Sequence, residues 1–553
     1  MVVTGIGIVG PTGIGLQPFW ASLVEGRSGI ARITRFDPTA IGCQIAGEVH
    51  DTSYETLLDP RKLRTATHVT QLALAAAQLA KADAGKSAEG FYRPDRMGVS
   101  IGSAFGGVRE ADQQHTVLLE RGARRVNPFI SNSTQASSIG AEIATAFGAQ
   151  GPRSVLSNGS LASLQAVADG ASLIARGDLD LCLAGGAESP IAPTLVAGLS
   201  RTQELSNYND DPERASCPFD RHHGGLVLSE GSCVLVLESA EKAAERGARV
   251  YCEVLGFAAS CDALGLYGLD PTYEPGARAI HQALARSTID MDDIDYVCAY
   301  ANSSPAFDRK EIGIIKKVYG RSATKLPISS IKGVFGDPVG ASGAFQIATV
   351  ALAIAYQVLP PTHNLKDPDP ECDFGLLLRA PLRASVGHAL VTAYSYGGDN
   401  ACLVLAAPTG TRSYSCFISY SSSDQAFAEK LCRDLRSKGI SCWFAPEDMK
   451  IGDRIRPRID ESIRAHDRLL LVLSGNSIAS HWVEQEVETA LAREREGEGA
   501  VLFPIRLDDA VMRAQTGWVA LVRNTRHIGD FRSWEDRSSY ERALNRLLRD
   551  LKE

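Results

Sequence analysis

Short apolar runs alternate with helical patterns along the whole of this 553-residue chain, and this alternation limits its fold more than any other feature. Typical segments are "LDLCLAGGAES", "CVLVLESAEKAAERG" and "HALVTAYSYGGDNACLVLAA". Buried strands that are joined by crossover helices build layered α/β architecture. We therefore predict an α/β fold in which helices pack on the faces of sheets.

The composition and residue pattern of the sequence change once, at "APTGTRSYS". Before this point the chain is rich in Ala and Gly. After it a fresh strand–helix pattern begins, and its helices carry many charges. We predict one domain over residues 1–407, a linker at 408–412 and a second domain over 413–553. A linker of so few residues keeps the second domain close to the first.

Composition and charge exclude several classes of function. The net charge of −8 gives no reason to expect binding to nucleic acid or to an acidic membrane surface. Every long apolar stretch is broken, so we expect no membrane span, and "MVVTGIGIVG" is expected to be a core strand rather than a signal peptide. The 12 cysteines form no C-x-x-C pair and no metal-ligand spacing. We expect reduced thiols, no metal and a cytoplasmic location.

The segment "GPRSVLSNGSLASLQAVADG" places one side chain at a strand-to-helix turn. An apolar run meets a tight Ser-Asn-Gly-Ser turn, and a helix of small residues follows. Ser160 then lies at the helix N-terminus, where the helix dipole and free N–H groups favour negative charge. Enzymes hold nucleophiles at such turns, so Ser160 is a nucleophile or the remnant of one.

Residues 1–407 resemble a beta-ketoacyl-acyl-carrier-protein synthase of the elongating kind. The motifs that carry the resemblance are "VVTGIGIVGPTG", "GSAFGG", "NPFISNSTQASSIGAEIATAFGAQGP", "GDLDLCLAGGAES", "PFDRHHGGLVLSEG" and "YGGDN". The resemblance implies a layered thiolase-type fold of two stacked βαβ halves and, usually, a homodimer. The segment "GDLDLCLAGGAES" matches the part of the family that forms the dimer.

The residues that condensation requires are replaced. The family uses a cysteine thiolate as nucleophile, and two histidines promote decarboxylation and stabilise the enolate. In this chain the matching positions are Ser160, Tyr300 in "CAYANSSP" and Asp337 in "IKGVFGDPVGASG", and only the family's lysine remains, as Lys332.

Three replacements at the three roles predict a domain without condensing activity. Tyr300 ionises near pH ~10 and is a poor base, and Asp337 brings negative charge to the place where the enolate would form. A domain that keeps this fold without the activity could serve for dimerisation or as a receptor for an acyl chain or carrier protein. Tyr394 and Tyr396 occupy the family's gate positions, and Ser395 replaces a glycine there and stiffens the gate. An active condensing enzyme with serine chemistry is the alternative.

Residues 413–553 resemble a bacterial TIR domain. The matching motifs are "FISYSSSDQAFAEKL", "WFAPEDMKIGDRIRPRIDESI", "LLLVLSGNSIASHWVEQEV" and "LFPIRLDD". The resemblance implies a flavodoxin-like parallel sheet with helices on both faces. Ligands of such sheets bind beyond the carboxyl ends of the strands.

One glutamate in "HWVEQEVETAL" is placed differently from its neighbours. Glu484 and Glu488 fall on the far side of the apolar stripe, as solvated surface charges do, whereas Glu486 lies at its other edge, four residues after Trp482. The stripe comprises Val483, Val487, Ala490 and Leu491. The resemblance implies that this W-x-x-x-E pattern carries the essential glutamate of NAD-cleaving TIR domains.

Other residues of this domain match the family's nucleotide pocket and its assembly loop. Tyr420, Ser421 and Trp443, with Trp482, match positions that line the pocket; core or loop packing is the alternative. The loop with Lys450, Arg454 and Arg456 resembles the one that helps TIR domains stack. A solvated basic loop is the alternative for that segment.

The resemblances together imply a TIR NAD+ hydrolase that is regulated and oligomerised by the synthase-like domain, as in bacterial antiphage factors that deplete NAD. Loss of nicotinamide leaves cationic character on the ribose, which a fixed carboxylate stabilises. NAD+ is then a substrate, and no cofactor is expected. We expect a homodimer or larger assembly, TIR–TIR contacts and an acyl, carrier-protein or phage-derived trigger. The alternative is a non-enzymatic TIR signalling adaptor scaffolded by a synthase-like dimer.

Overall fold

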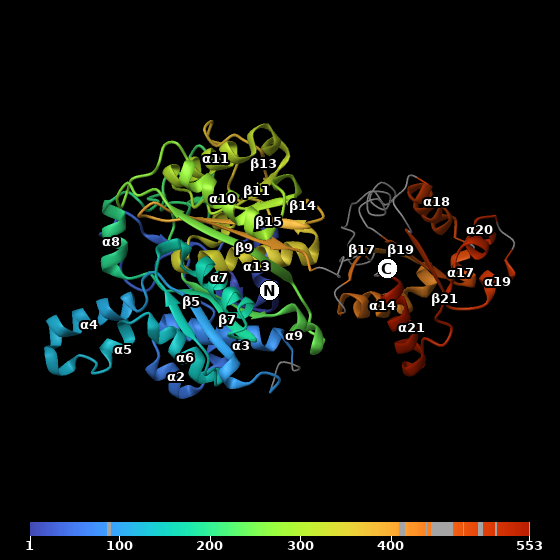
Figure 1. Cartoon of the computed structure of the whole chain (residues 1–553), viewed down its shortest axis with the longest axis horizontal. Coiled ribbons are helices and arrows are strands. Elements are labelled where there is room, and N and C mark those ends of the chain that lie inside the picture. Colours follow the sequence, from blue (N-terminus) through green and yellow to red (C-terminus); the bar gives the residue numbers. More distant parts are fainter. Residues whose placement is uncertain are drawn as a thin grey trace. The chain divides into compact units, whose positions relative to one another are not determined.

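The computed structural model describes residues 1–85, 90–408, 415–437, 440–443, 468–478, 480–495, 501–514 and 517–551. They form two compact units, Met1–Pro408 and Thr409–Glu553, which we describe separately (Figure 1). Apart from Pro408, the predicted linker lies outside the described residues.

The first unit is built on one mixed sheet of 12 strands, in the order β13-β11-β10-β15-β16-β9-β1-β8-β7-β5-β6, with β2 paired to β1. Its strands are β1 (Val2–Gly10), β2 (Gly13–Ile14), β5 (Met97–Gly102), β6 (Arg153–Leu156), β7 (Leu181–Glu188), β8 (Gly231–Glu238), β9 (Cys252–Cys261), β10 (Tyr296–Cys298), β11 (Pro327–Ser329), β13 (Leu376–Leu377), β15 (His388–Tyr394) and β16 (Asp399–Ala406). Two short pairs stand apart: β3 (Ala31–Arg32) with β4 (Ile45–Ala46), and β12 (Val358–Leu359) with β14 (Leu382–Arg383).

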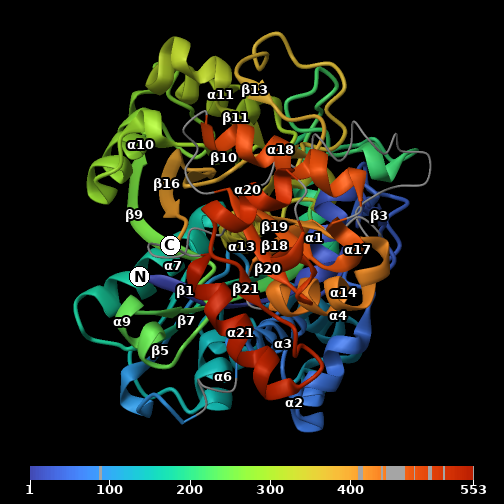
Figure 2. The same cartoon turned by 90° about the vertical axis from the view of Figure 1, so that its right-hand side faces the viewer.

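Helices lie on the outer faces of the two halves of this sheet and between them. The outer pairs are α3 (His68–Asp83) with α6 (Ser137–Phe147), and α10 (Glu274–Ser287) with α11 (Pro305–Tyr319); the inner pair is α7 (Ala162–Ala175) with α13 (Ser342–Tyr356). Figures 1 and 2 show α10 and α11 above, α3 and α6 below, and α7 and α13 in the middle. This layering confirms the predicted thiolase-type fold. The remaining helices are α1 (Leu16–Glu25), α2 (Pro60–Thr65), α4 (Val108–Arg121), α5 (Ile130–Thr134), α8 (Pro193–Arg201), α9 (Ala240–Glu245) and α12 (Lys332–Phe335).

The helical stretch Val339–Tyr356, which includes α13, is long and apolar enough to cross a membrane. Like the other long apolar stretches of the sequence it is broken by polar residues, here Ser342, Gln346 and Thr349. Moreover, 83% of this stretch is buried inside the structure. A helix that is apolar on every side suits the centre of a layered core, and we interpret it as a core helix.

The segment that we expect to match the dimer-forming part of the family lies inside the sheet of a single chain. The segment "GDLDLCLAGGAES" contains β7, which pairs with β5 on one side and β8 on the other, and all eight of its residues are buried. Its continuous apolar run is that of a strand in the middle of a sheet. The strand at this end of the sheet is β6, whose outer edge has no paired strand among the described residues.

The second unit holds a parallel five-stranded sheet in the order β18-β17-β19-β20-β21. The strands are β17 (Ser415–Ser419), β18 (Ser441–Trp443), β19 (Arg468–Leu473), β20 (Leu502–Arg506) and β21 (Gly529–Asp530). One face packs against α14 (Gln425–Ser437) and α21 (Arg537–Asp550), and the other against α18 (His481–Arg495) and α20 (Gly517–Thr525). Among the described residues, two short helices, α17 (Gly475–Ile478) and α19 (Ala510–Arg513), also belong to this unit. The flavodoxin-like prediction is confirmed.

Candidate functional sites

The turn that carries Ser160 joins β6 to α7 as the sequence predicts. A short 3-10 turn, Gly159–Leu161, precedes the helix. Gly159 has a φ of 60°, and a Cβ at this position would lie only 2.0 Å from Oγ of Ser395, so a glycine is required there. The Ser160 side chain is buried rather than presented at the surface, with an exposed fraction of 5%.

The structure brings together the four residues that match the family's catalytic positions. The Tyr300 hydroxyl donates a hydrogen bond to Oγ of Ser160 at 3.0 Å and lies 3.3 Å from Oδ2 of Asp337. Nζ of Lys332 is 3.4 Å from Oδ1 of Asp337 and 3.4 Å from the centroid of the Tyr300 ring. A lysine over an aromatic face adds a cation–π attraction to the ion pair.

Asp337 is further held by three neutral donors. Asn302 Nδ2 donates to its Oδ2 at 2.9 Å, and Ser342 Oγ and the main-chain N–H of Val339 donate to its Oδ1 at 2.7 and 3.0 Å. Asn302 also donates to the Tyr300 hydroxyl oxygen at 3.1 Å. The sequence analysis missed Asn302 and Ser342, although both lie within five residues of a predicted position.

Burial shifts the pKa values of two groups in this site, Tyr300 and Lys332. Burial, reinforced by the charge of Asp337, raises the pKa of Tyr300 well above 10, so its phenol stays protonated at neutral pH. Burial also lowers the pKa of Lys332, and the charge of Asp337 opposes that shift. The residue next to Ser160 is therefore a hydrogen-bond donor and not a base.

The gate segment differs in part from the prediction. Tyr394 ends β15 and is fully buried, so it belongs to the core and not to a rim. Tyr396 is half-buried in the following turn. The Ser160 N–H donates to Oγ of Ser395 at 3.2 Å, a contact that the sequence analysis did not predict.

A buried histidine near this site was also missed. The ring of His223 lies between two carboxylates, with Nδ1 2.9 Å from Asp308 and Nε2 3.0 Å from Asp369. Asp308 also accepts the main-chain N–H groups of Asn302 and Ser303. The histidine pair in "PFDRHHGG" could have indicated this cluster, but we interpreted that segment only as a motif of the family resemblance.

In the second unit, the charge of Glu486 acts on Tyr420, which follows β17 at the carboxyl edge of the sheet. The Glu486 side chain is only 9% exposed, whereas Glu488 on the same helix is exposed and Glu484 is intermediate. Burial raises the pKa of Tyr420 to about 12, with further contributions that include the charges of Glu429 and Glu486. Glu486 is thus a buried carboxylate near the edge where ligands of such sheets bind.

The other predicted pocket residues lie in the core, in a turn or outside the described part of the chain. Trp443 is buried and stacks on Phe417, with ring centroids 4.7 Å apart, which agrees with the core-packing alternative. Ser421 is half-buried in the turn after β17. Trp482 falls in the first turn of α18, and its side chain lies outside the described part. Lys450, Arg454 and Arg456 lie outside the described residues.

Polar groups that the sequence analysis missed link the turns at this carboxyl edge. Ser474, after β19, donates through Oγ to Oδ2 of Asp424 at 2.5 Å. The Gly475 N–H donates to Oδ2 of Asp508, after β20, at 2.8 Å. These contacts fix the edge beside which Tyr420 lies.

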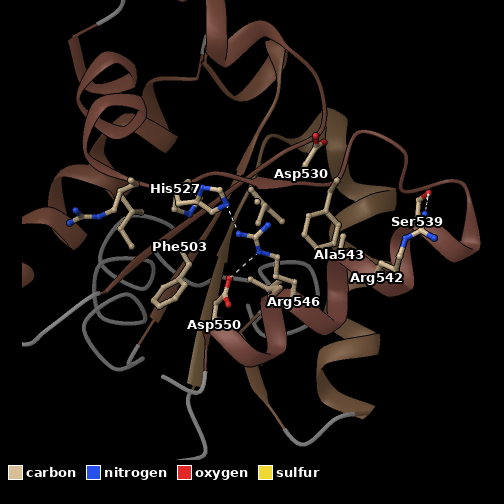
Figure 3. Close-up of a pocket in the computed structure, with 15 residues that line it drawn as sticks. Phe503, His527, Asp530, Ser539, Arg542, Ala543, Arg546 and Asp550 are labelled. Atoms are coloured by element: carbon tan, nitrogen blue, oxygen red, sulfur yellow. Dashed lines mark hydrogen bonds and ion pairs between the residues drawn. The ribbon is translucent and has the colours of Figure 1, made fainter.

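A cavity of about 460 Å³ lies elsewhere, between the strands β20 and β21 and the helix α21 (Figure 3). Arg546, one of its lining residues, donates to Nε2 of His527 at 2.8 Å and forms an ion pair at 3.7 Å with Asp550 on the same helix. Glu486 and Tyr420 do not line this cavity. Among the described residues no group of three His, Cys, Asp or Glu side chains is arranged to hold a metal ion.

Comparisons with known proteins agree with both resemblances. Residues 1–243 match the N-terminal domain model of beta-ketoacyl synthases, residues 251–366 match the C-terminal domain model, and residues 416–548 match the TIR domain model. The tetracenomycin polyketide synthase ketoacyl synthase alpha subunit of Streptomyces glaucescens is 38% identical over 75% of this chain and 98% of that protein. The 3-oxoacyl-acyl-carrier-protein synthase 2 of Synechocystis is 36% identical over 73% and 97%.

Solved structures give the same assignment for the first unit. A beta-ketoacyl synthase from Burkholderia phymatum matches with a TM-score of 0.69 and 28% identity, over 74% of this chain and 99% of that one. The ishigamide ketosynthase/chain length factor matches with a TM-score of 0.68 and 28% identity, over 74% and 98%. The chain belongs to the beta-ketoacyl synthase family. Within that family it is a fusion, with a TIR domain at its C-terminal side.

Proposed function

We propose that the TIR domain cleaves the bond between nicotinamide and ribose in NAD+, with Glu486 as the catalytic carboxylate. The observation that carries this proposal is the burial of the Glu486 side chain, whose charge acts on Tyr420 at the carboxyl edge of the sheet. NAD+ is the substrate, and the products are nicotinamide and linear or cyclic ADP-ribose. No resident cofactor takes part.

Cleavage of the bond to nicotinamide requires one negative charge in a fixed position. As the bond to nicotinamide breaks, the ribose gains oxocarbenium character, which a carboxylate close to the sugar stabilises. A buried carboxylate does this more strongly than a solvated one because little water screens its charge. Glu488, which is exposed on the same helix, lacks that advantage.

The synthase-like domain, in this proposal, does not condense acyl groups. Tyr300 stays protonated and the carboxyl group of Asp337 is paired with Lys332, so neither histidine role is filled. The domain instead assembles the chain into a homodimer or larger oligomer, as the ketosynthases solved with a chain length factor pair with a related subunit. It thereby sets how TIR domains meet.

The whole protein is then a cytoplasmic sensor and effector that depletes NAD in antiphage defence. An acyl, carrier-protein or phage-derived signal changes the assembly, and TIR–TIR contacts form through the loop that contains Arg454. Expression in bacteria at a level high enough for mass action to drive assembly without the signal tests the proposal: cellular NAD should fall with the wild-type chain and stay constant with Glu486→Gln at equal protein level. If NAD stays constant with both, the non-enzymatic adaptor replaces the enzyme as the proposed function; if NAD falls with both, Glu486 is not the catalytic carboxylate.

A further inference from the structure

The cavity beside β21 in the second unit forms where the sheet ends unevenly (Figure 3). β21 consists only of Gly529 and Asp530, which pair with Ile505 and Arg506. The first half of β20 therefore has no paired strand on this side among the described residues. α21 supplies the opposite wall, and the space between has a volume of about 460 Å³. This volume lies within the range of small-molecule sites, ~300–1,000 Å³.

The main-chain donors on this side of β20 need no further chain segment. The Leu507 N–H donates to the carbonyl of Leu473 in β19, so by the alternation of a parallel strand the even-numbered residues of β20 face the cavity. Leu502 donates its N–H to Oε1 of Glu494 at 2.9 Å, and Pro504 has no N–H. The edge of β20 is thus satisfied without another strand, and the space beside it can hold a ligand.

Positive charge is in excess at the mouth of the cavity. Arg542 and Arg546 lie four residues apart on α21, so both guanidiniums project from the same face of the helix. Arg546 forms the ion pair with Asp550 at 3.7 Å. Arg542 donates to Oγ of Ser539 at 3.1 Å and forms no ion pair with a residue that the structure describes. The other aspartate of the lining, Asp530, is already paired with two arginines outside the cavity.

The other nitrogen-bearing side chains of the lining are already engaged. Arg526 forms an ion pair with Glu494, which offsets its charge. Nε2 of His527 lies 2.8 Å from a guanidinium nitrogen of Arg546. Because a guanidinium only donates, Nε2 accepts, and the imidazole is neutral with its proton on Nδ1. His527 therefore orients the Arg546 guanidinium without adding charge, and further N–H groups of Arg546 remain for an acceptor.

The inner wall of the cavity is apolar. It is lined by Phe503, Ile505, Phe531, Ala543 and Leu547, all of which belong to or pack against the core between the sheet and α21. A small inorganic anion at the arginines would leave this wall uncovered. An anion that carries an apolar chain would cover it and gain the free energy of burying that chain.

We propose that this cavity binds an organic anion in which a carboxylate or phosphate group is joined to an aliphatic chain, with the anionic group between Arg542 and Arg546 and the chain against Phe503 and Leu547. Guanidiniums hold the oxygens of both groups through paired N–H donors. The like charges of Arg542 and Arg546 repel each other one turn apart, and an anion between them relieves that repulsion. Glu486 does not line the cavity, so the proposal does not depend on NAD cleavage.

Isothermal titration calorimetry on the full-length protein tests this site with octanoate, octyl phosphate and inorganic phosphate. We expect both octyl anions to bind, and the tighter of the two identifies the preferred anionic group. Inorganic phosphate should bind at least about tenfold more weakly, because it leaves the apolar wall uncovered. Arg542→Gln and Arg546→Gln should each weaken binding of the octyl anions by about tenfold, which corresponds to about 1.4 kcal/mol.

Two further variants separate this cavity from other sites on the chain. Arg549→Gln removes an exposed arginine of the same helix that does not line the cavity, and it should leave all affinities unchanged. Ala543→Leu fills part of the apolar wall and should weaken the octyl anions while inorganic phosphate binds as before. No binding of either octyl anion at millimolar concentration, or binding that Arg542→Gln and Arg546→Gln leave unchanged, would overturn the proposal. An equal loss in Arg549→Gln would overturn it as well.

Discussion

Tyr300 donates a 3.0 Å hydrogen bond to Oγ of Ser160, so the position beside the former nucleophile holds a proton donor. A serine hydroxyl needs a neighbouring base before it attacks a thioester. The phenol cannot serve, because burial and the charge of Asp337 raise the pKa of Tyr300 well above 10.

The first prediction is that the purified protein forms no carbon–carbon bond between acyl and malonyl thioesters. The reason is the combined replacement at Ser160, Tyr300 and Asp337. Product analysis by mass spectrometry after incubation with both thioesters checks it. A condensation product that disappears in Ser160→Ala would show that the site is active.

The second prediction concerns the ion pair that supports the site. Asp337→Asn leaves the ammonium of Lys332 buried without its counter-charge, and the first domain should lose about 3 kcal/mol of stability. Thermal unfolding measures the loss. Glu245→Gln, which removes an exposed partner of Lys242, is the control and should leave the transition unchanged. Equal transitions in all three proteins would mean that the buried pair adds nothing.

The third prediction is a pH dependence that originates at His223. Burial alone would lower the pKa of His223, but hydrogen bonds and charge interactions with Asp308 and Asp369 outweigh it and raise the pKa above 6.5. Because the unfolded chain has the ordinary pKa near 6.5, this stabilisation is complete below that pH and is lost as pH rises through the raised value.

Unfolding measured from pH 6 upward tests this dependence. His223→Gln should remove part of the fall in stability with rising pH, since its side chain carries no titrating charge. His222→Gln is the control, because His222 is exposed next to it. A wild-type profile that His223→Gln leaves unchanged would refute the assignment.

The sequence alone could predict both folds because strand and helix periodicity, together with long matching motifs, constrain architecture strongly. The resemblance predicted that Ser160, Tyr300 and Asp337 lie close together. No local pattern could have shown this, since these residues lie on three separate segments. The burial of Glu486 followed from its place at the edge of the apolar stripe of α18, whose members Val483 and Val487 are fully buried.

What the sequence could not show depends on contacts between distant segments. No periodicity indicates that Ser395 bonds to the Ser160 N–H or that Glu204 meets Tyr396, because each pair is far apart in the chain. The neighbours of β7 in the sheet could not be predicted for a similar reason. A continuous apolar strand predicts burial, and its neighbours in the sheet are set by topology.

The fourth prediction couples the two domains. NAD cleavage should need two TIR domains brought together, and the synthase-like dimer supplies the high effective concentration that a short linker allows. Arg454→Glu should weaken assembly and cleavage together, as measured by light scattering and nicotinamide release over a dilution series. Cleavage by a dilute, monomeric segment 413–553 at the full-length rate would contradict this coupling.

The most direct test of the central claim is the release of nicotinamide from NAD+ by the purified full-length protein at high concentration, compared among wild type, Glu486→Gln and Glu488→Gln. We predict release by the wild type and by Glu488→Gln, and none by Glu486→Gln, with the same oligomeric state and thermal unfolding in all three. Release by Glu486→Gln at the wild-type rate would contradict the account, as would the absence of release from all three proteins at a concentration at which light scattering shows that they have assembled.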